Sequence, residues 1–227
     1  MRFEELNWFD IENYLESDDR LMLVLGACEQ HGYLSLTTDA LIPQALGDAA
    51  SKQTGVLVAP PINFGASPYY LAYPGTLSLR LSTLLDTVED LVRSAYGQGF
   101  RSILVLNGHG GNVGVRGRLY ELANELPDMQ FAWYAWWQSH SVKLLAESHD
   151  LKPAHANWLE AFPFTQVSEL PDGEKTPPKV AGLLGAKQAK QTYGDGVFGG
   201  AYHVDPSIMD EIFKATLEDV LQLLQFE

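Results

Sequence analysis

The chain has 227 residues, 46% of them hydrophobic, so it can bury a sizeable core and lies at the upper end of the size of one domain. We therefore expect residues 1–227 to form a single domain. The formal net charge of -14 at pH 7 argues against binding to nucleic acid, whose phosphates would be repelled, and against an anionic membrane surface.

Targeting and redox features point to the cytoplasm. The acidic opening segment, residues 1–20, lacks the apolar core of a secretory signal or transit peptide. No stretch approaches the ~18 apolar residues of a membrane span. The single cysteine, Cys28, cannot form an internal disulfide, which fits a reducing compartment. We expect a cytoplasmic protein whose partner is a small molecule, with no nucleic acid and no membrane.

Potential metal ligands follow the first predicted strand. Residues 7–15 have the spacing of a short helix, and the apolar run 21–25 is typical of a buried parallel strand. Glu29, His31 and Asp39 come directly after that run. Two carboxylates and an imidazole suit a divalent transition metal. An ordinary charged loop after a strand could have the same composition, so this stretch alone does not distinguish a metal site from such a loop.

The next segments predict helix, strand, loop and helix. Residues 40–55 favour a helix that begins near Leu41 or Ile42, because Pro43 lacks an amide proton, and that ends at Gly55. Residues 55–59 predict a short strand that Pro60 and Pro61 stop. The long aromatic loop 62–78 should lie on the rim of a pocket, since such loops are often functional. Residues 82–97 predict an amphipathic helix.

A second strand also ends in a potential ligand. The apolar residues 103–106 precede Asn107, Gly108 and His109, and helical spacing follows, so a helix amino terminus should lie beside His109. Ligands bind outside the carboxyl ends of parallel strands, where both sets of side chains would meet. The glycine-rich turn lacks the patterns of nucleotide-binding loops.

The alternation of strands and helices predicts an α/β fold. Residues 129–137 predict an aromatic strand whose end carries Trp136 and Trp137, either as core or as pocket residues. The order of elements predicts a three-layer α/β/α sandwich with a mostly parallel sheet. Asp205 and Pro206 should cap a final helix.

Residues 138–192 show no clean periodicity. We place His140 and His149 on the surface and expect His203 to be a packing or surface residue. His155 and Glu160 could reach one site only if His155 precedes the helix, because residues five apart on a helix diverge by about 140°.

Several motifs together resemble the creatininase (creatinine amidohydrolase) family. Residues 29–32 (EQHG) with 38–39 (TD) and residues 107–112 (NGHGGN) resemble its two main signatures. Residues 60–65 (PPINFG), 73–79 (YPGTLSL) and His155, Ala156 and Glu160 resemble further segments, in the family's order. Tyr69 and Tyr70 stand where the family commonly has an acidic residue and a histidine. Gly111 stands where creatininase proper has a carboxylate.

The resemblance implies a metal-dependent hydrolase of a small, cyclic amide. Glu29, Asp39 and His109 would bind one divalent ion, and His31, Asp39 and Glu160 a second, with Asp39 bridging. The ions, zinc, manganese or iron, would generate the hydroxide that attacks the amide, although a single ion is also possible. His155 would act as general acid, beside Glu160. The resemblance also implies a homo-oligomer, with a hexamer as the expected form.

Three other readings of the sequence remain open. Cys28 and His31 could serve a cysteine hydrolase, although residues three apart on a strand face opposite sides. A binuclear phosphoesterase would use similar ligands. A non-catalytic binding protein with a degraded site would need no metal.

Overall fold

The fold is a parallel sheet between two layers of helices. The structure is a computed structural model and describes residues 1–226. Four parallel strands lie in the order β2-β1-β3-β4, namely β2 (Leu57–Val58), β1 (Arg20–Leu25), β3 (Ser102–Asn107) and β4 (Gln130–Ala135). The three-layer α/β/α architecture predicted from the sequence is confirmed.

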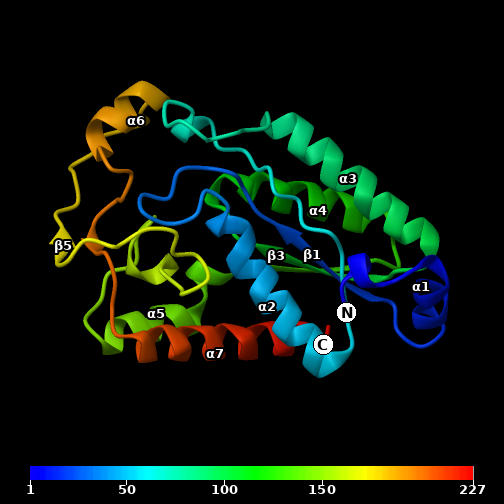
Figure 1. The fold of residues 1–227 in the computed structure, drawn as a ribbon. Coiled ribbons are helices and arrows are strands. Elements are labelled where there is room, and N and C mark those ends of the chain that lie inside the picture. Colours follow the sequence, from blue (N-terminus) through cyan, green and yellow to red (C-terminus); the bar gives the residue numbers. More distant parts are fainter. Residues whose placement is uncertain (227) are drawn as a thin grey trace.

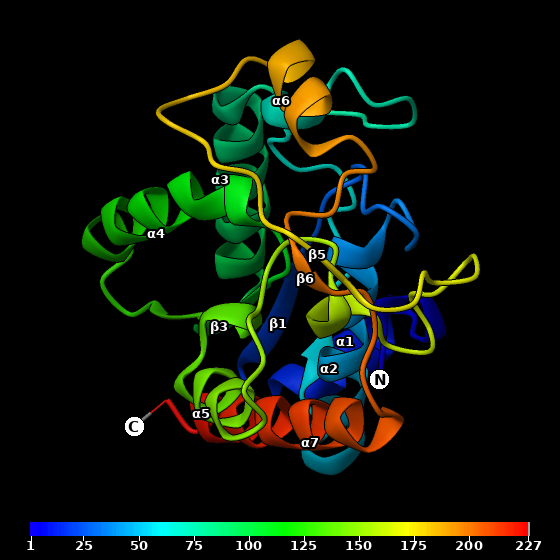
Figure 2. The same cartoon turned by 90° about the vertical axis from the view of Figure 1, so that its left-hand side faces the viewer.

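Helices cover both faces of this sheet (Figure 1). Helices α3 (Leu81–Gln98) and α4 (Gly114–Glu125) lie on one face, and α2 (Thr38–Thr54), α5 (His140–Ser148) and α7 (Pro206–Leu223) lie on the other (Figures 1 and 2). The short helices α1 (Trp8–Leu15) and α6 (Ala186–Tyr193) lie near opposite ends of the molecule. A small antiparallel pair joins β5 (Glu174–Lys175) to β6 (Gly200–Ala201).

Strand β1 shows how the sheet divides the core. Met22 and Val24 pack with α2 and α7, whereas Leu21, Leu23 and Leu25 pack with α3 and α4. Side chains alternate along a strand, so a strand that is apolar throughout is buried on both faces. Register then aligns the strand ends, because Leu25 pairs with Asn107. The segments that leave β1 and β3 therefore start side by side.

Helix α2 begins earlier than its proline suggested. The helix starts at Thr38, so the expected start near Leu41 or Ile42 was wrong, and Pro43 lies inside it. Proline removes one hydrogen bond of the second turn. The buried side chains Ile42 and Leu46 pack in the core on this helix, which offsets that loss. The early start matters because it places Asp39 in the first helical turn.

Two other boundaries differ from expectation. Strand β4 ends at Ala135, and Trp136 and Trp137 belong to a 3-10 turn, η4 (Trp136–Gln138), instead of the strand. The segment after β3 forms a 3-10 turn, η3 (Gly110–Val113), before α4 begins at Gly114. His109 therefore directly precedes a 3-10 turn and not the amino terminus of an α-helix.

The remaining 3-10 turns are η1 (Phe3–Glu5), η2 (Pro68–Tyr70) and η5 (Trp158–Glu160), of which the last two flank the site described below. Within residues 1–226, no helix combines the length and the apolar character needed to cross a membrane.

Candidate metal centre

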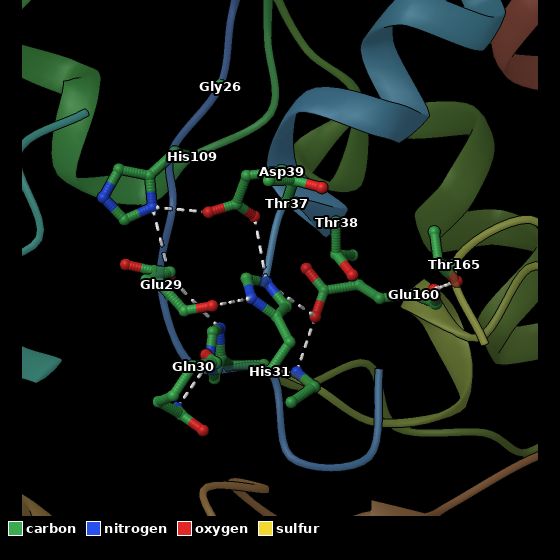
Figure 3. Close-up of polar contacts among 12 residues, drawn as sticks. Gly26, Glu29, Gln30, His31, Thr37, Thr38, Asp39, His109, Glu160 and Thr165 are labelled. Atoms are coloured by element: carbon green, nitrogen blue, oxygen red, sulfur yellow. Dashed lines mark hydrogen bonds and ion pairs between the residues drawn. The ribbon is translucent and has the colours of Figure 1, made fainter. Parts of the chain in front are cut away.

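Five buried acidic and histidine side chains meet at the carboxyl ends of β1 and β3 (Figure 3). Glu29 and His31 lie on the loop that leaves β1, Asp39 lies in the first turn of α2, and His109 follows β3. Glu160 comes from the other side, at the end of η5. The structure thus brings together every residue that the sequence predicted as a metal ligand.

The first group of potential ligands comprises Glu29, Asp39 and His109. Nδ1 of His109 lies 3.0 Å from Asp39 Oδ2 and 3.3 Å from Glu29 Oε1. The ligand atoms of these residues all lie within 4.8 Å of one another, although the residues come from three different segments. Two carboxylates and one imidazole nitrogen make a donor set suited to zinc, manganese or iron.

The second group comprises His31, Asp39 and Glu160. Nε2 of His31 lies 3.0 Å from Asp39 Oδ1 and 3.8 Å from Glu160 Oε2. Asp39 therefore presents Oδ1 to one group and Oδ2 to the other, as Figure 3 shows. This is the arrangement of a carboxylate that can bridge two ions.

Backbone carbonyls orient both imidazoles. Nε2 of His109 lies 3.0 Å from the carbonyl oxygen of Ala66, and Nδ1 of His31 lies 3.2 Å from that of Glu29. A carbonyl only accepts, so each of these nitrogens carries the proton and donates it. The other nitrogen of each ring faces the carboxylates and becomes available to an ion once it loses its proton. Such outer hydrogen bonds are typical of metal-bound histidines.

Some polar atoms of the cluster are buried without a hydrogen-bond partner. Among the described residues these include Glu29 Oε2, His31 Nε2 and Asp39 Oδ2. A buried polar atom without a partner costs about 1–3 kcal/mol, and such atoms call for an explanation. Cations at the two groups would satisfy all three atoms, so the residues present fit metal ions.

The electrostatics of the cluster show how strongly its charges interact. Burial opposes the charged form of His31, but Asp39 and Glu160 outweigh it and raise its pKa to about 10. Asp39 likewise has its pKa held well below its usual range by His31 and His109, against the effect of burial. Burial, followed by the charge of Asp39, raises the pKa of Glu29, and burial raises the pKa of Glu160 to about 7. In the absence of a metal ion, protons on His31 and His109 provide the positive charge that balances the carboxylates.

His155 lies at the edge of this cluster. Its Nδ1 is 3.9 Å from Glu29 Oε1, and its Nε2 is 3.1 Å from the carbonyl oxygen of Gln30. The ring stacks on Tyr70 at 4.8 Å with an interplanar angle of 14°. Burial and the charge of His31 lower the pKa of His155 well below its ordinary value, so the imidazole is neutral. One face of the ring is thus fixed while Nδ1 stays directed at the site.

A strained turn brings His155 and Glu160 to one site. Ala156 has φ of 60°, in the left-handed region that non-glycine residues seldom adopt. Its amide donates to Glu160 Oε2 at 2.5 Å. His155 therefore precedes η5, as the sequence argument required. Trp158, between them, is fully buried in the core and does not face the site.

A cavity of about 520 Å³ opens onto the cluster. Glu29, Asp39, His109, His155 and Glu160 line its floor. The loop 62–78 contributes Ser67, Pro68, Tyr69 and Tyr70 to its wall, which agrees with the predicted place of this loop at the pocket. The volume lies in the range of ordinary small-molecule sites.

The sequence model of the creatininase family, described as creatinine amidohydrolase, matches residues 4–224. The chain belongs to the creatininase family. A solved structure described as creatininase Mn superposes with a TM-score of 0.82 at 20% identity, over 99% of this chain and 97% of the other. That likeness concerns the fold, which agrees with the family assignment.

Curated relatives have different activities. A creatinine amidohydrolase from Pseudomonas putida is 35% identical over 112 residues, which are 46% of this chain and 43% of that protein. A mycofactocin precursor peptide peptidase from Mycobacterium ulcerans is 38% identical over 116 residues, 46% of each protein. The matched part spans less than half of each relative. These family members are hydrolases of different substrates, so membership leaves the substrate open.

Asn112 holds the family's NGHGGN motif together, a role that the sequence did not reveal. Its amide nitrogen donates to the carbonyl of Gly26 at 3.0 Å and to Asn107 Oδ1 at 3.2 Å, while its oxygen accepts from the amide of Ala66 at 3.2 Å. One buried side chain thus ties the ends of β1 and β3 to the loop 62–78. A polar residue that closes a buried turn gives no periodic signal in a sequence.

Close backbone contacts explain two glycines of the same motif. A Cβ atom at Gly108 would lie 1.8 Å from the carbonyl oxygen of Asp39, and one at Gly111 would lie 2.0 Å from that of Ala66. Side chains are therefore excluded at both positions. The carboxylate that stands at the latter position in creatininase proper would not fit here, and Glu160 is the acidic residue that the structure brings to the second group.

The other singled-out residues lie apart from the cluster. His149 pairs with Glu211 at 3.2 Å, and the exposed His203 lies 3.6 Å from Asp172. His140 is exposed, and Cys28 directs Sγ at the carbonyl of Gly75, 3.5 Å away. Trp136 is buried in the core, whereas Trp137 lines the cavity, so the two tryptophans divide the roles that the sequence left open.

Proposed function

We propose that this chain is a metal-dependent amidohydrolase with two divalent ions. Glu29, Asp39 and His109 would hold one ion, and His31, Asp39 and Glu160 the other. The observation that carries the proposal is the position of Asp39, whose two oxygens each lie 3.0 Å from the available nitrogen of a different histidine. When bound, such ions lower the pKa of water from ~15.7 toward neutrality and polarise a carbonyl oxygen.

A residue of the chain would then transfer the proton between the attacking water and the leaving nitrogen. Nε2 of His155 lies 3.1 Å from the main-chain carbonyl oxygen of Gln30 and 2.9 Å from the side-chain nitrogen of the same residue, so Gln30 engages this ring nitrogen. Nδ1, which lies 3.9 Å from Glu29 Oε1, is therefore the ring nitrogen that would exchange protons with the attacking water and the leaving nitrogen. An amine leaves poorly unless it is protonated, so this second transfer is needed for C–N cleavage. We propose His155 as the acid–base residue on this geometry.

Tyr70 supports this role by holding the ring. Its stacking on the imidazole and the contact of Gln30 restrict His155 from two sides. A catalytic base that is held in one orientation spends less free energy on alignment in the transition state.

The arrangement disfavours the alternative with a cysteine nucleophile. Sγ of Cys28 is directed at the carbonyl of Gly75, and both nitrogens of His31 face Glu29 or Asp39. Cys28 also does not line the cavity that opens onto the cluster.

The test is a substrate panel with metal-loaded and chelator-treated protein. We expect hydrolysis of at least one small amide, with creatinine and other cyclic amides in the panel, only in protein loaded with Mn²⁺ or Zn²⁺. A matched panel of phosphate monoesters and diesters separates the amidase from a binuclear phosphoesterase. Faster turnover of phosphate esters than of amides would contradict the proposal, as would equal turnover after chelation.

A further inference from the structure

The cavity above the metal cluster has a polar floor and a mostly apolar wall. All of its acidic and histidine residues belong to the cluster or are His155. The rest of the wall is almost entirely apolar and includes Tyr69, Tyr70, Leu81, Trp137, Leu159 and Phe198. No lysine or arginine lines it among the described residues.

Three segments that are distant in sequence supply the aromatic wall. Tyr69 and Tyr70 belong to η2, Phe198 lies after α6, and Trp137 lies in η4. The centroids of the Tyr69 and Tyr70 rings lie 5.2 Å apart at an interplanar angle of 84°. Phe198 lies 6.3 Å from the first ring and 6.1 Å from the second.

A buried contact outside the cavity fixes this wall. Tyr193, at the end of α6, stacks on Phe198 at 3.9 Å and 12°. Helix α6 packs beside η2, as Figure 1 shows at the upper left. The rings are therefore held in place before any ligand enters, which favours binding because little side-chain entropy remains to be lost.

The charges around the cavity restrict the ligand. An anionic substituent would find no basic side chain in the wall. A cationic substituent would face two divalent ions, whose charge exceeds that of Glu29, Asp39 and Glu160 together. Rigid apolar and aromatic walls instead favour an uncharged apolar group.

We propose that the substrate amide carries an uncharged apolar ring that packs against the wall formed by Tyr69, Tyr70 and Phe198 while the amide group lies over the ions. This inference rests on the proposed two-ion centre for the position of the amide. It adds the class of the substituent: the wall selects an uncharged ring-bearing amide over one with a small or charged substituent.

Hydroxamates test the wall separately from turnover. The hydroxamate group chelates divalent ions through two oxygens, so it places its substituent in the cavity. We would measure dissociation constants of acetohydroxamate and benzohydroxamate for Mn²⁺-loaded protein by calorimetry. Burial of the ring should make benzohydroxamate bind about tenfold or more tightly. Ring derivatives with a 4-carboxylate or a 4-aminomethyl group should bind more weakly than benzohydroxamate.

Variants show whether the wall causes this selectivity. Tyr69→Ala and Phe198→Ala should weaken the binding of benzohydroxamate while the affinity for acetohydroxamate stays constant. The ratio of the dissociation constant of acetohydroxamate to that of benzohydroxamate should therefore fall. Tyr69 is partly exposed, so its truncation keeps the inference testable should the Phe198 variant fold poorly. Tyr120→Ala is the matched control, because this aromatic residue on α4 is 62% exposed and lies outside the cavity.

Each outcome decides the matter. Equal affinities in the parent, a ratio that both variants leave unchanged, or tighter binding of a charged derivative would overturn the inference alone. Failure of both uncharged hydroxamates to bind the metal-loaded parent would overturn the two-ion function and the inference with it.

Discussion

The main-chain carbonyl oxygen of Gln30 lies 3.1 Å from Nε2 of His155 and its side-chain nitrogen lies 2.9 Å from the same atom, so the loop after β1 holds in place a ring that comes 125 positions later in the sequence. The same loop carries Glu29 and His31 on either side of Gln30. One short segment therefore provides two potential ligands and also contacts the proposed acid–base residue.

Replacement of His155 by alanine should abolish proton transfer without emptying the metal centre. We expect turnover to fall by about 10²–10⁴-fold, the usual contribution of a general acid–base residue. Metal content should stay at the parent value, because the two proposed ligand sets do not include His155. His149→Ala, in a histidine paired with Glu211 on the surface, is the control and should keep parental activity. Undiminished turnover in His155→Ala would remove it from the mechanism.

The two glycines around His109 allow a matched steric test. A Cβ atom at Gly108 would lie 1.8 Å from the carbonyl oxygen of Asp39, whereas one at Gly110 would meet no atom within 4 Å. Gly108→Ala should therefore destabilise the fold by about 1–3 kcal/mol and weaken metal binding, because Asp39 must shift. Gly110→Ala should change stability by less than about 0.5 kcal/mol. Urea unfolding of both variants measures this, and equal stabilities would contradict the close contact.

Metal uptake should release protons and strengthen as pH rises. In the metal-free protein the pKa of His31 is raised to about 10 and that of His109 lies well above its ordinary value, so both hold protons near neutral pH. Ligands must be deprotonated to bind an ion. Calorimetry in buffers with different ionisation enthalpies should report net proton release. Affinity that does not change between pH 6 and pH 8 would contradict this coupling.

Glu160→Gln should weaken one ion more than the other. The substitution removes a charged oxygen from the group that also contains His31, while Glu29 and His109 keep their own carboxylate partner in Asp39. We expect metal content to fall toward one ion per chain, with the melting temperature of the metal-free protein retained. Glu121→Gln, on the surface of α4, is the control. Two ions and full turnover in Glu160→Gln would refute the assignment.

The strands and their polar ends were predictable because their signals are local. The runs 21–25 and 103–106 are apolar at every position, which only burial on both faces explains, and ligand-type residues follow each. Parallel register then brings those residues together without further information. Helix α7 was likewise predictable from its stripe and from Asp205, whose side chain accepts from the amide of Ser207.

Other features depend on contacts between distant segments. The start of α2 depends on core packing that outweighs the effect of Pro43. The approach of Glu160 to the cluster depends on the strained turn at Ala156. Neither feature has a periodic pattern, and the motif resemblance was needed to place Glu160 at all. The aromatic wall was foreseen only as a pocket rim, because Phe198 comes from a glycine-rich segment without periodicity.

The central claim is a two-ion centre bridged by Asp39, and elemental analysis of the parent and of Asp39→Ala tests it most directly. Both proteins would be loaded with Mn²⁺, passed through a desalting column and measured for manganese per chain. We predict two ions per parent chain and none in the variant, because its missing carboxylate would serve both groups. A parent that retains fewer than two ions, or a variant that keeps both, would contradict the bridged centre.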